Sequence, residues 1–167
     1  VSTGALFILV GLLYERRHTF QIKEFGGLAT TVPVFATFFV IVALSSLGLP
    51  MLNGFVGEFL IIVGAFGRSH VYGAIAAAGV VLAAVYLLWM VQRVFYGEVT
   101  NEKNRMPDCS LREKIILVTL VVTILGMGIY PQLFLRKLDT TVTQIIERVE
   151  PGKLAYEMPQ VNAGQQR

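Results

Sequence analysis

A long apolar stretch that contains one acid constrains this chain more than any other feature. From Phe25 to Gly67 the only charged residue is Glu58. Over the whole chain 54% of residues are hydrophobic and 15% are charged, whereas about a quarter of the residues in soluble globular domains are charged. We therefore interpret the chain as an all-α, polytopic bundle of transmembrane helices. The apolar runs cover Val1 to Tyr14, Val32 to Phe66, Val71 to Gln92 and Ile115 to Leu135.

Basic residues in the loops predict how these runs cross the membrane. One basic loop follows the first apolar run and another precedes the last, and the positive-inside rule places both on the cytoplasmic side. The run from Val32 to Phe66 must then cross only once. As a straight helix it would be about 52 Å long, whereas the hydrocarbon core is about 30 Å thick. The basic residues are Arg16, Arg17 and Lys23 in the first loop and Arg93, Lys103, Arg105, Arg112 and Lys114 in the second.

This excess length predicts a broken helix. The break is expected from Gly48 to Gly54, because Pro50 removes a backbone donor and the two glycines loosen the helix. We expect half-helices over Pro33 to Leu47 and Phe55 to Phe66, with Glu58 in the first turn of the second. Non-helical backbone at this depth is tolerated only inside protein or beside a wet cavity.

The chain is predicted to hold about four transmembrane helices and a tail. Residues 1–135 form the membrane part, and we expect Val1 to lie inside a helix of a longer protein, of which this is the C-terminal part. Apolar residues then recur every three or four positions over 136–150, which predicts an amphipathic helix on the outer surface or on a partner. Residues 151–167 are rich in Pro, Gly, Gln and Asn and are predicted to be a disordered tail.

Glu58 is the leading candidate for function. A carboxylate facing lipid costs roughly 2.5 kcal/mol or more, and intramembrane acids usually line ion or substrate pathways. The structural alternative is that Glu58 stays permanently protonated and forms a hydrogen bond across a helix interface. Ser45, Ser46 and Asn53 near the break could hold water or only satisfy local backbone groups, and Pro50 and Gly54 are the residues that form the break. His18 is either a proton relay or a solvated residue that caps a helix.

Several other function classes are not supported by the sequence. Cys109 is the only cysteine, so neither a disulfide framework nor a thiolate metal site is available within the chain. No phosphate-binding glycine loop, HExxH zinc site or nucleophile elbow occurs, so we expect no cofactor or metal to be bound by this chain. The net charge of +3 arises from loops and tail and does not predict nucleic-acid binding.

The remaining charged residues are expected to be structural. Glu15 is expected to form an ion-pair cluster with Arg16 and Arg17. The acids of the second basic loop are interpreted as ordinary loop residues: Glu98, Glu102, Asp108 and Glu113.

At this point the pattern resembles a known family. Tyr14-Glu15-Arg16-Arg17-His18-Thr19 follows Leu6-Phe7 and Gly11, and Gly26-Gly27-Leu28 comes next. Leu47-Gly48-Leu49-Pro50 then leads into Asn53-Gly54-Phe55-Val56-Gly57-Glu58-Phe59. Over roughly Val1 to Val149 this is similar to the C-terminal part of the antiporter-like subunit M family of NADH-quinone oxidoreductase, called chain 4 in mitochondrial complex I.

The resemblance implies a proton-translocating subunit of about fourteen transmembrane helices, of which this chain holds about the last four. It implies that Glu58 lies on a hydrophilic axis through the membrane arm, where related subunits tend to carry Lys. The family's other key residues, a glutamate, two lysines and a histidine, would precede Val1.

The resemblance also implies where the redox chemistry takes place. The complex uses NADH, FMN, iron-sulfur clusters and quinone in other subunits, so this chain is expected to be a non-redox part of the translocase. Its implied partners are the paralogous membrane-arm subunits and the lipid bilayer, in a multi-pass position in the bacterial inner membrane. The alternatives are a subunit of a multisubunit Na⁺/H⁺ antiporter, an arm of a membrane-bound hydrogenase, or a purely structural membrane anchor.

Overall fold

The structure is a computed structural model that describes residues 1–99 and 101–149, without the side chains at 140 and 147–149. Every regular element in this part of the chain is an α-helix or a short 3₁₀ helix. The chain divides into two units, residues 1–129 and the residues from 130 onward. The first unit holds α1 (Ser2–Arg17), η1 (Ile22–Glu24), α2 (Leu28–Thr31), α3 (Pro33–Ser46), α4 (Asn53–Arg68), α5 (His70–Phe95), η2 (Glu102–Asn104) and α6 (Leu111–Ile129), and the second holds α7 (Gln132–Val149).

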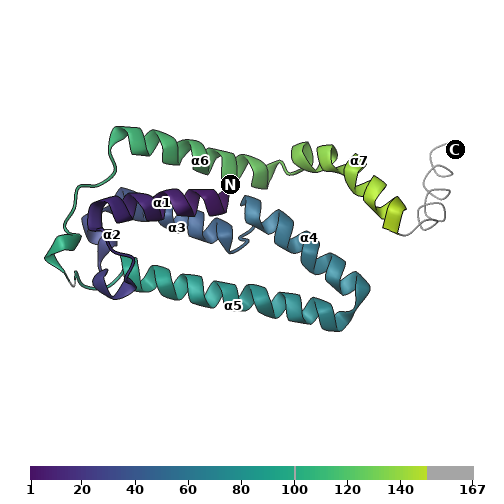
Figure 1. The fold of residues 1–167 in the computed structure, drawn as a ribbon, viewed down its shortest axis with the longest axis horizontal. Helices are drawn as coiled ribbons and strands as arrows, with labels where there is room; N and C mark the ends of the chain where they lie inside the picture. The colour runs from purple at the N-terminus through teal and green to yellow at the C-terminus, as the bar shows by residue number, and fades with distance from the viewer. Residues whose placement is uncertain (100, 150–167) are drawn as a thin grey trace. The chain divides into compact units, whose positions relative to one another are not determined.

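Within the first unit the helices run back and forth along one direction (Figure 1). α1 runs one way, α3 and α4 together run back, α5 returns, and α6 reverses again. The two basic loops therefore lie at the same end, as the single crossing of the broken segment requires. The amide nitrogen of Asn104 joins these loops by donating to the carbonyl oxygens of Glu24 and Gly26, both at 3.3 Å.

The core of this unit forms where α1, α3, α5 and α6 meet. The rings of Phe35 and Phe39 on α3 lie 6.2 and 4.7 Å from the ring of Phe95 at the end of α5. Leu9 on α1 and Ile124 on α6 are fully buried. α3 is therefore the central helix of the unit, whereas α4 buries no side chain in the described chain.

The predicted break is confirmed, and its cause is more specific than a proline in a helix. The Leu49 N–H donates to the Leu44 carbonyl, and the Gly48 N–H donates to the Ser45 carbonyl. This pair of bonds is a Schellman motif, with Gly48 in the left-handed conformation at φ 66°. Gly48 thus ends α3 at Ser46, two residues before Pro50 is reached.

Pro50 lies in the turn that follows. The Leu52 N–H bonds to the Leu49 carbonyl at 3.1 Å, and Met51 has φ 74°, which a turn of type II requires at its third position. α4 then begins at Asn53, two residues earlier than expected. The prediction that Glu58 lies in the first turn of this half-helix is therefore wrong, because it lies in the second turn.

α5 is the described helix that is long and apolar enough to cross a membrane by itself. α6 is long and apolar enough to cross a membrane only when it is joined with α7, and α3 is apolar but short. α6 ends at Ile129, before Pro131 and within the apolar run from Ile115 to Leu135. Proline cannot continue a helix, and here its carbonyl instead accepts the first bonds of α7.

The second unit is described only by α7. This helix covers most of 136–150 but begins at Gln132. Its placement on an outer surface or a partner stays a prediction, and the predicted tail at 151–167 lies outside the described residues.

Candidate functional site

The carboxyl group of Glu58 lies against the backbone of the break. Side chains on a helix tilt toward its N-terminus, so Glu58 in the second turn of α4 reaches back toward the turn that precedes the helix. There the carboxyl group contacts Gly48, and a Cβ atom at Gly48 would clash with the Oε2 atom. Glu58 is half-buried, and no residue in the described ranges makes a hydrogen bond or ion pair with it.

Two further glycines let the backbone close around this turn. A Cβ atom at Gly54 would meet the Ser45 carbonyl oxygen, and one at Gly128 on α6 would meet the Met51 carbonyl oxygen. Because Gly54 and Gly128 lack a Cβ atom, the start of α4 approaches the end of α3, and α6 approaches the turn, by their main chains. The break that Glu58 contacts is therefore packed in part by backbone against backbone.

Three polar side chains form a cluster beside the break. The Ser2 and Ser45 hydroxyl oxygens lie 2.7 Å apart, and each lies 2.6 Å from the Asn53 Oδ1 atom. The cluster joins the start of α1, the last turn of α3 and the first residue of α4. Ser45 is fully buried and Ser2 nearly so, so the cluster lies inside the protein rather than in lipid.

The hydrogen atoms of this cluster allow two arrangements. Two hydroxyl groups supply two hydrogens for three short contacts, so one contact stays without a hydrogen while Asn53 presents its oxygen. If the amide turns over, its NH₂ group donates to both serines and all three contacts become hydrogen bonds. Sequence reasoning selected Ser45 and Asn53 but missed Ser2, because its partners are more than 40 positions away.

The other predicted residues are placed differently. The Ser46 hydroxyl is buried and has no hydrogen-bond partner among the described residues, and Pro50 is exposed in the turn. His18 is exposed at the far end of α1, where its N–H bonds to the Tyr14 carbonyl at 2.7 Å. Because the 16-residue α1 is about 24 Å long, the structure does not bring His18 to the break.

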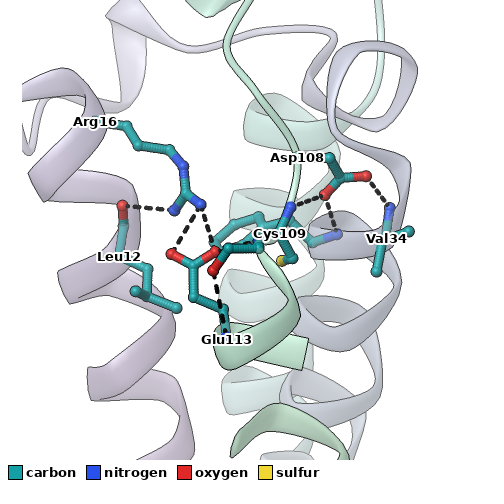
Figure 2. Close-up of polar contacts among 8 residues, drawn as sticks. Leu12, Arg16, Val34, Asp108, Cys109 and Glu113 are labelled. Carbon is teal, nitrogen blue, oxygen red and sulfur yellow. Dashed lines mark hydrogen bonds and ion pairs between the residues drawn. The ribbon is translucent and has the colours of Figure 1, made fainter. Parts of the chain in front are cut away.

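At the end with the basic loops, Arg16 makes a two-bond ion pair with Glu113 (Figure 2). The Arg16 Nη2 atom lies 2.9 and 2.8 Å from the two carboxylate oxygens, and both side chains are mostly buried. The expected cluster of Glu15 with Arg16 and Arg17 is wrong, because Arg17 pairs with Glu24 at 3.7 Å and no described residue forms an ion pair with Glu15. The interpretation of Glu113 as an ordinary loop acid is also wrong.

Asp108 is likewise more than a loop acid. Its carboxylate accepts hydrogen bonds from the N–H groups of Val34 and Phe35 at 2.9 and 3.0 Å, and so caps the start of α3 from another loop (Figure 2). Partial burial raises the pKa of Asp108, but the backbone N–H groups of Val34, Cys109 and Phe35 together hold it below its usual value.

The neighbouring Cys109 is buried and carries no disulfide. Burial, followed by the negative charges of Asp108 and Glu113, raises the pKa of the Cys109 thiol to about 11. This thiol is therefore protonated at neutral pH and serves as a small apolar residue.

Comparison with known proteins identifies the family. The model of the family described as "NADH:quinone oxidoreductase/Mrp antiporter, TM" matches residues 1–95, which include the first loop, the break and Glu58. The chain belongs to this family. The match covers α1 to α5, which carry Glu58 and the polar cluster at the break.

Similar proteins within this family carry the names that the resemblance implied. The chain is 39% identical over 146 residues to NADH-ubiquinone oxidoreductase chain 4 of Marchantia polymorpha, and 40% identical over 147 residues to NADH-quinone oxidoreductase subunit M of Rickettsia typhi. Each match covers 87% of this chain and 30% of the relative. The chain thus spans less than a third of the length of these relatives.

Solved structures support the same fold. A chain of respiratory complex I from Thermus thermophilus matches with a TM-score of 0.76 and 38% identity, over 81% of this chain and 28% of that chain. A chain of the Mrp complex from Dietzia matches with a TM-score of 0.69 over 80% of this chain and 33% of that chain, but its 22% identity shows the fold alone. The all-α membrane-subunit fold and the resemblance to subunit M are confirmed. The roles of Glu58, Ser45, Ser46, Pro50, Asn53, Gly54 and His18 stay predictions.

Proposed function

We propose that this chain is part of a proton-translocating membrane-arm subunit of an NADH:quinone oxidoreductase, in which Glu58 takes up and releases protons. The observation that carries the proposal is the position of the Glu58 carboxyl group, which contacts Gly48 at the break between α3 and α4. Broken helices are where membrane transporters place their ion sites. The proposal is also supported by the names of the relatives, which are subunits M and chains 4 of such oxidoreductases.

The arrangement of the break suggests how Glu58 would work. A carboxyl group without a side-chain partner in the described chain is free to exchange a proton with water or with a group that another segment supplies. Gly48 leaves room for the carboxyl group beside the backbone, and the cluster of Ser2, Ser45 and Asn53 adds hydroxyl and amide groups at the same break. The half-helix therefore presents an ionisable group at a polar interruption of the span.

In this proposal the chain contributes no redox centre. NADH, FMN, iron-sulfur clusters and quinone would be bound by other subunits, and the chain would contact paralogous antiporter-like subunits in the membrane arm. We propose the bacterial inner membrane as its location.

The test is the Glu58→Gln substitution in the full-length subunit of the assembled complex. It keeps the size and hydrogen-bonding capacity of the side chain but removes its proton exchange. We expect the loss of most proton translocation and most quinone reductase activity, measured on inverted vesicles or on reconstituted complex.

The matched control is Glu15→Gln, which makes the same chemical change at an exposed acid that forms no ion pair in the described chain. It should leave both rates unchanged. Wild-type rates in the Glu58→Gln complex would refute the proposed role of Glu58.

A second candidate is a subunit of a multisubunit Na⁺/H⁺ antiporter, favoured by the Mrp name within the family description. In that case ion exchange would proceed in vesicles without any electron donor and would depend on the sodium concentration. Proton translocation that requires NADH and quinone, and is indifferent to sodium, supports the first candidate.

A further inference from the structure

An apolar cavity of about 230 Å³ lies beneath the first basic loop. Its walls come from α1, α3, α5 and the loop residues, and include Val10, Phe20, Phe39 and Met90. Phe20 at this cavity is 69% exposed. The cavity is partly open to the surface of the described chain, so within a membrane an apolar chain can enter it.

A second hollow of about 440 Å³ lies on the adjacent face of the same end of α5, and its lining includes polar as well as apolar side chains. It is lined by Trp89, Gln92, Arg93 and Tyr96, and the Arg93 guanidinium lies over the Trp89 ring, 4.7 Å from its centroid. At 100° per residue, Arg93 and Met90 are roughly 60° apart around the helix axis, so the two hollows are neighbours.

Arg93 is available to an external anion. Arg16, Arg17 and Arg105 each form an ion pair with a glutamate, whereas no carboxylate in the described ranges pairs with Arg93. The first loop adds Lys23, which is exposed. An arginine flanked by Trp and Tyr at the end of an apolar helix is suited to the interfacial region of a bilayer, where anionic headgroups gather.

We propose that this end of the chain binds one anionic phospholipid, with an acyl chain in the cavity beneath the first loop and the phosphate against Arg93. The apolar hollow selects a hydrocarbon chain, and the unpaired guanidinium selects a negatively charged headgroup. The site is separate from Glu58, which lies at the break between α3 and α4, and it does not depend on proton translocation by the protein.

The experiment uses the full-length protein in its native complex, depleted of lipid in mild detergent. The probe is phosphatidylglycerol with a photoactivatable group at the end of one acyl chain, and crosslinked peptides are mapped by mass spectrometry. We expect crosslinks to the peptides that contain Val10 and Met90. Unlabelled phosphatidylglycerol should compete about fivefold better than phosphatidylcholine, as expected for one basic residue near the headgroup.

Two variants and one control test the two halves of the site. Arg93→Gln should weaken competition by phosphatidylglycerol about fivefold, and Val10→Phe should abolish the crosslinks by filling the cavity from a partly exposed position. Lys103→Gln removes an exposed positive charge that lines neither hollow and should change nothing. Three results would each overturn the proposal. Phosphatidylcholine could compete equally well, the crosslinks could lie only elsewhere, or a density map of the complex could show a protein segment in the cavity. Because the readout is lipid labelling, loss of the proposed proton transport would not affect the result.

Discussion

Substitution of Gly48 by alanine tests the contact between the Glu58 carboxyl group and Gly48 most directly. Gly48 has φ 66°, and an L-residue in the left-handed region costs about 1–2 kcal/mol. The added Cβ would also clash with the Glu58 carboxyl group, and forced repacking of this kind typically costs about 1–3 kcal/mol. We therefore expect Gly48→Ala to lower the free energy of unfolding by about 2–5 kcal/mol.

The measurement is an unfolding titration with SDS in mixed micelles on the full-length protein. Gly57→Ala is the matched control, because Gly57 lies within α4 next to Glu58 and a Cβ atom added there would meet open space, with nothing within 4 Å. Alanine is the better helix former by up to about 1 kcal/mol, so this variant should be as stable as the wild type or more stable.

A double mutant separates the two contributions. In a Glu58→Ala background the carboxyl group is gone, so Gly48→Ala should cost only the backbone part, about 1–2 kcal/mol. Equal effects of Gly48→Ala and Gly57→Ala would refute the contact between Glu58 and Gly48. An unchanged cost of Gly48→Ala in the Glu58→Ala background would refute the steric part alone.

Three further predictions concern the turn and the loop end. Met51→Gly should raise the free energy of unfolding by about 1 kcal/mol, because Met51 has φ 74° and glycine adopts this conformation without strain; the same SDS titration measures it. Asp108 has a pKa below its usual value, so the stability that its charge adds to the cap of α3 is present above about pH 4 and is lost as the pH falls through the lowered value. Asp108→Asn should therefore lower the free energy of unfolding by about 1 kcal/mol near neutrality and should make this free energy less dependent on pH below about pH 4. If the variant lost stability at acid pH as steeply as the wild type, the cap by Asp108 would be contradicted. Cys109 has a pKa of about 11, so its alkylation at about pH 8 should be on the order of 100-fold slower than that of an ordinary thiol, with the SDS-unfolded protein as the control.

Local sequence signals predicted the break well. Gly48, Pro50 and Gly54 act on their own neighbours, so the interruption and its place between two half-helices could be derived without tertiary information. The apolar pattern continues past Pro131, but α6 ends before it, because proline cannot continue a helix. Here a local backbone rule prevailed over apolar periodicity.

The contacts that hold the site together could not be derived in this way. Ser2 joins Ser45 and Asn53 only because α1 lies beside the break, and Asp108 caps α3 only because two distant loops meet. Serine and aspartate in isolation carry no signal for such long-range roles. The pattern of Ser110 followed by Glu113 could have indicated a capping box, and the Ser110 N–H does bond to the Glu113 carboxylate at 2.7 Å.

The two halves of the broken span are held very differently. α3 is capped at its start by Asp108, is buried along its length, and is tied to α1 at its last turn through Ser45. α4 buries no side chain in the described chain and packs mainly on α5. Because Phe95 holds the end of α5 in the core against α3, we expect any rearrangement at the break to move α4 while α3 and the end of α5 stay in place. Such a movement would lift the acid away from Gly48, so that access to the acid would depend on the position of α4 rather than on a rotation of the acid's own side chain.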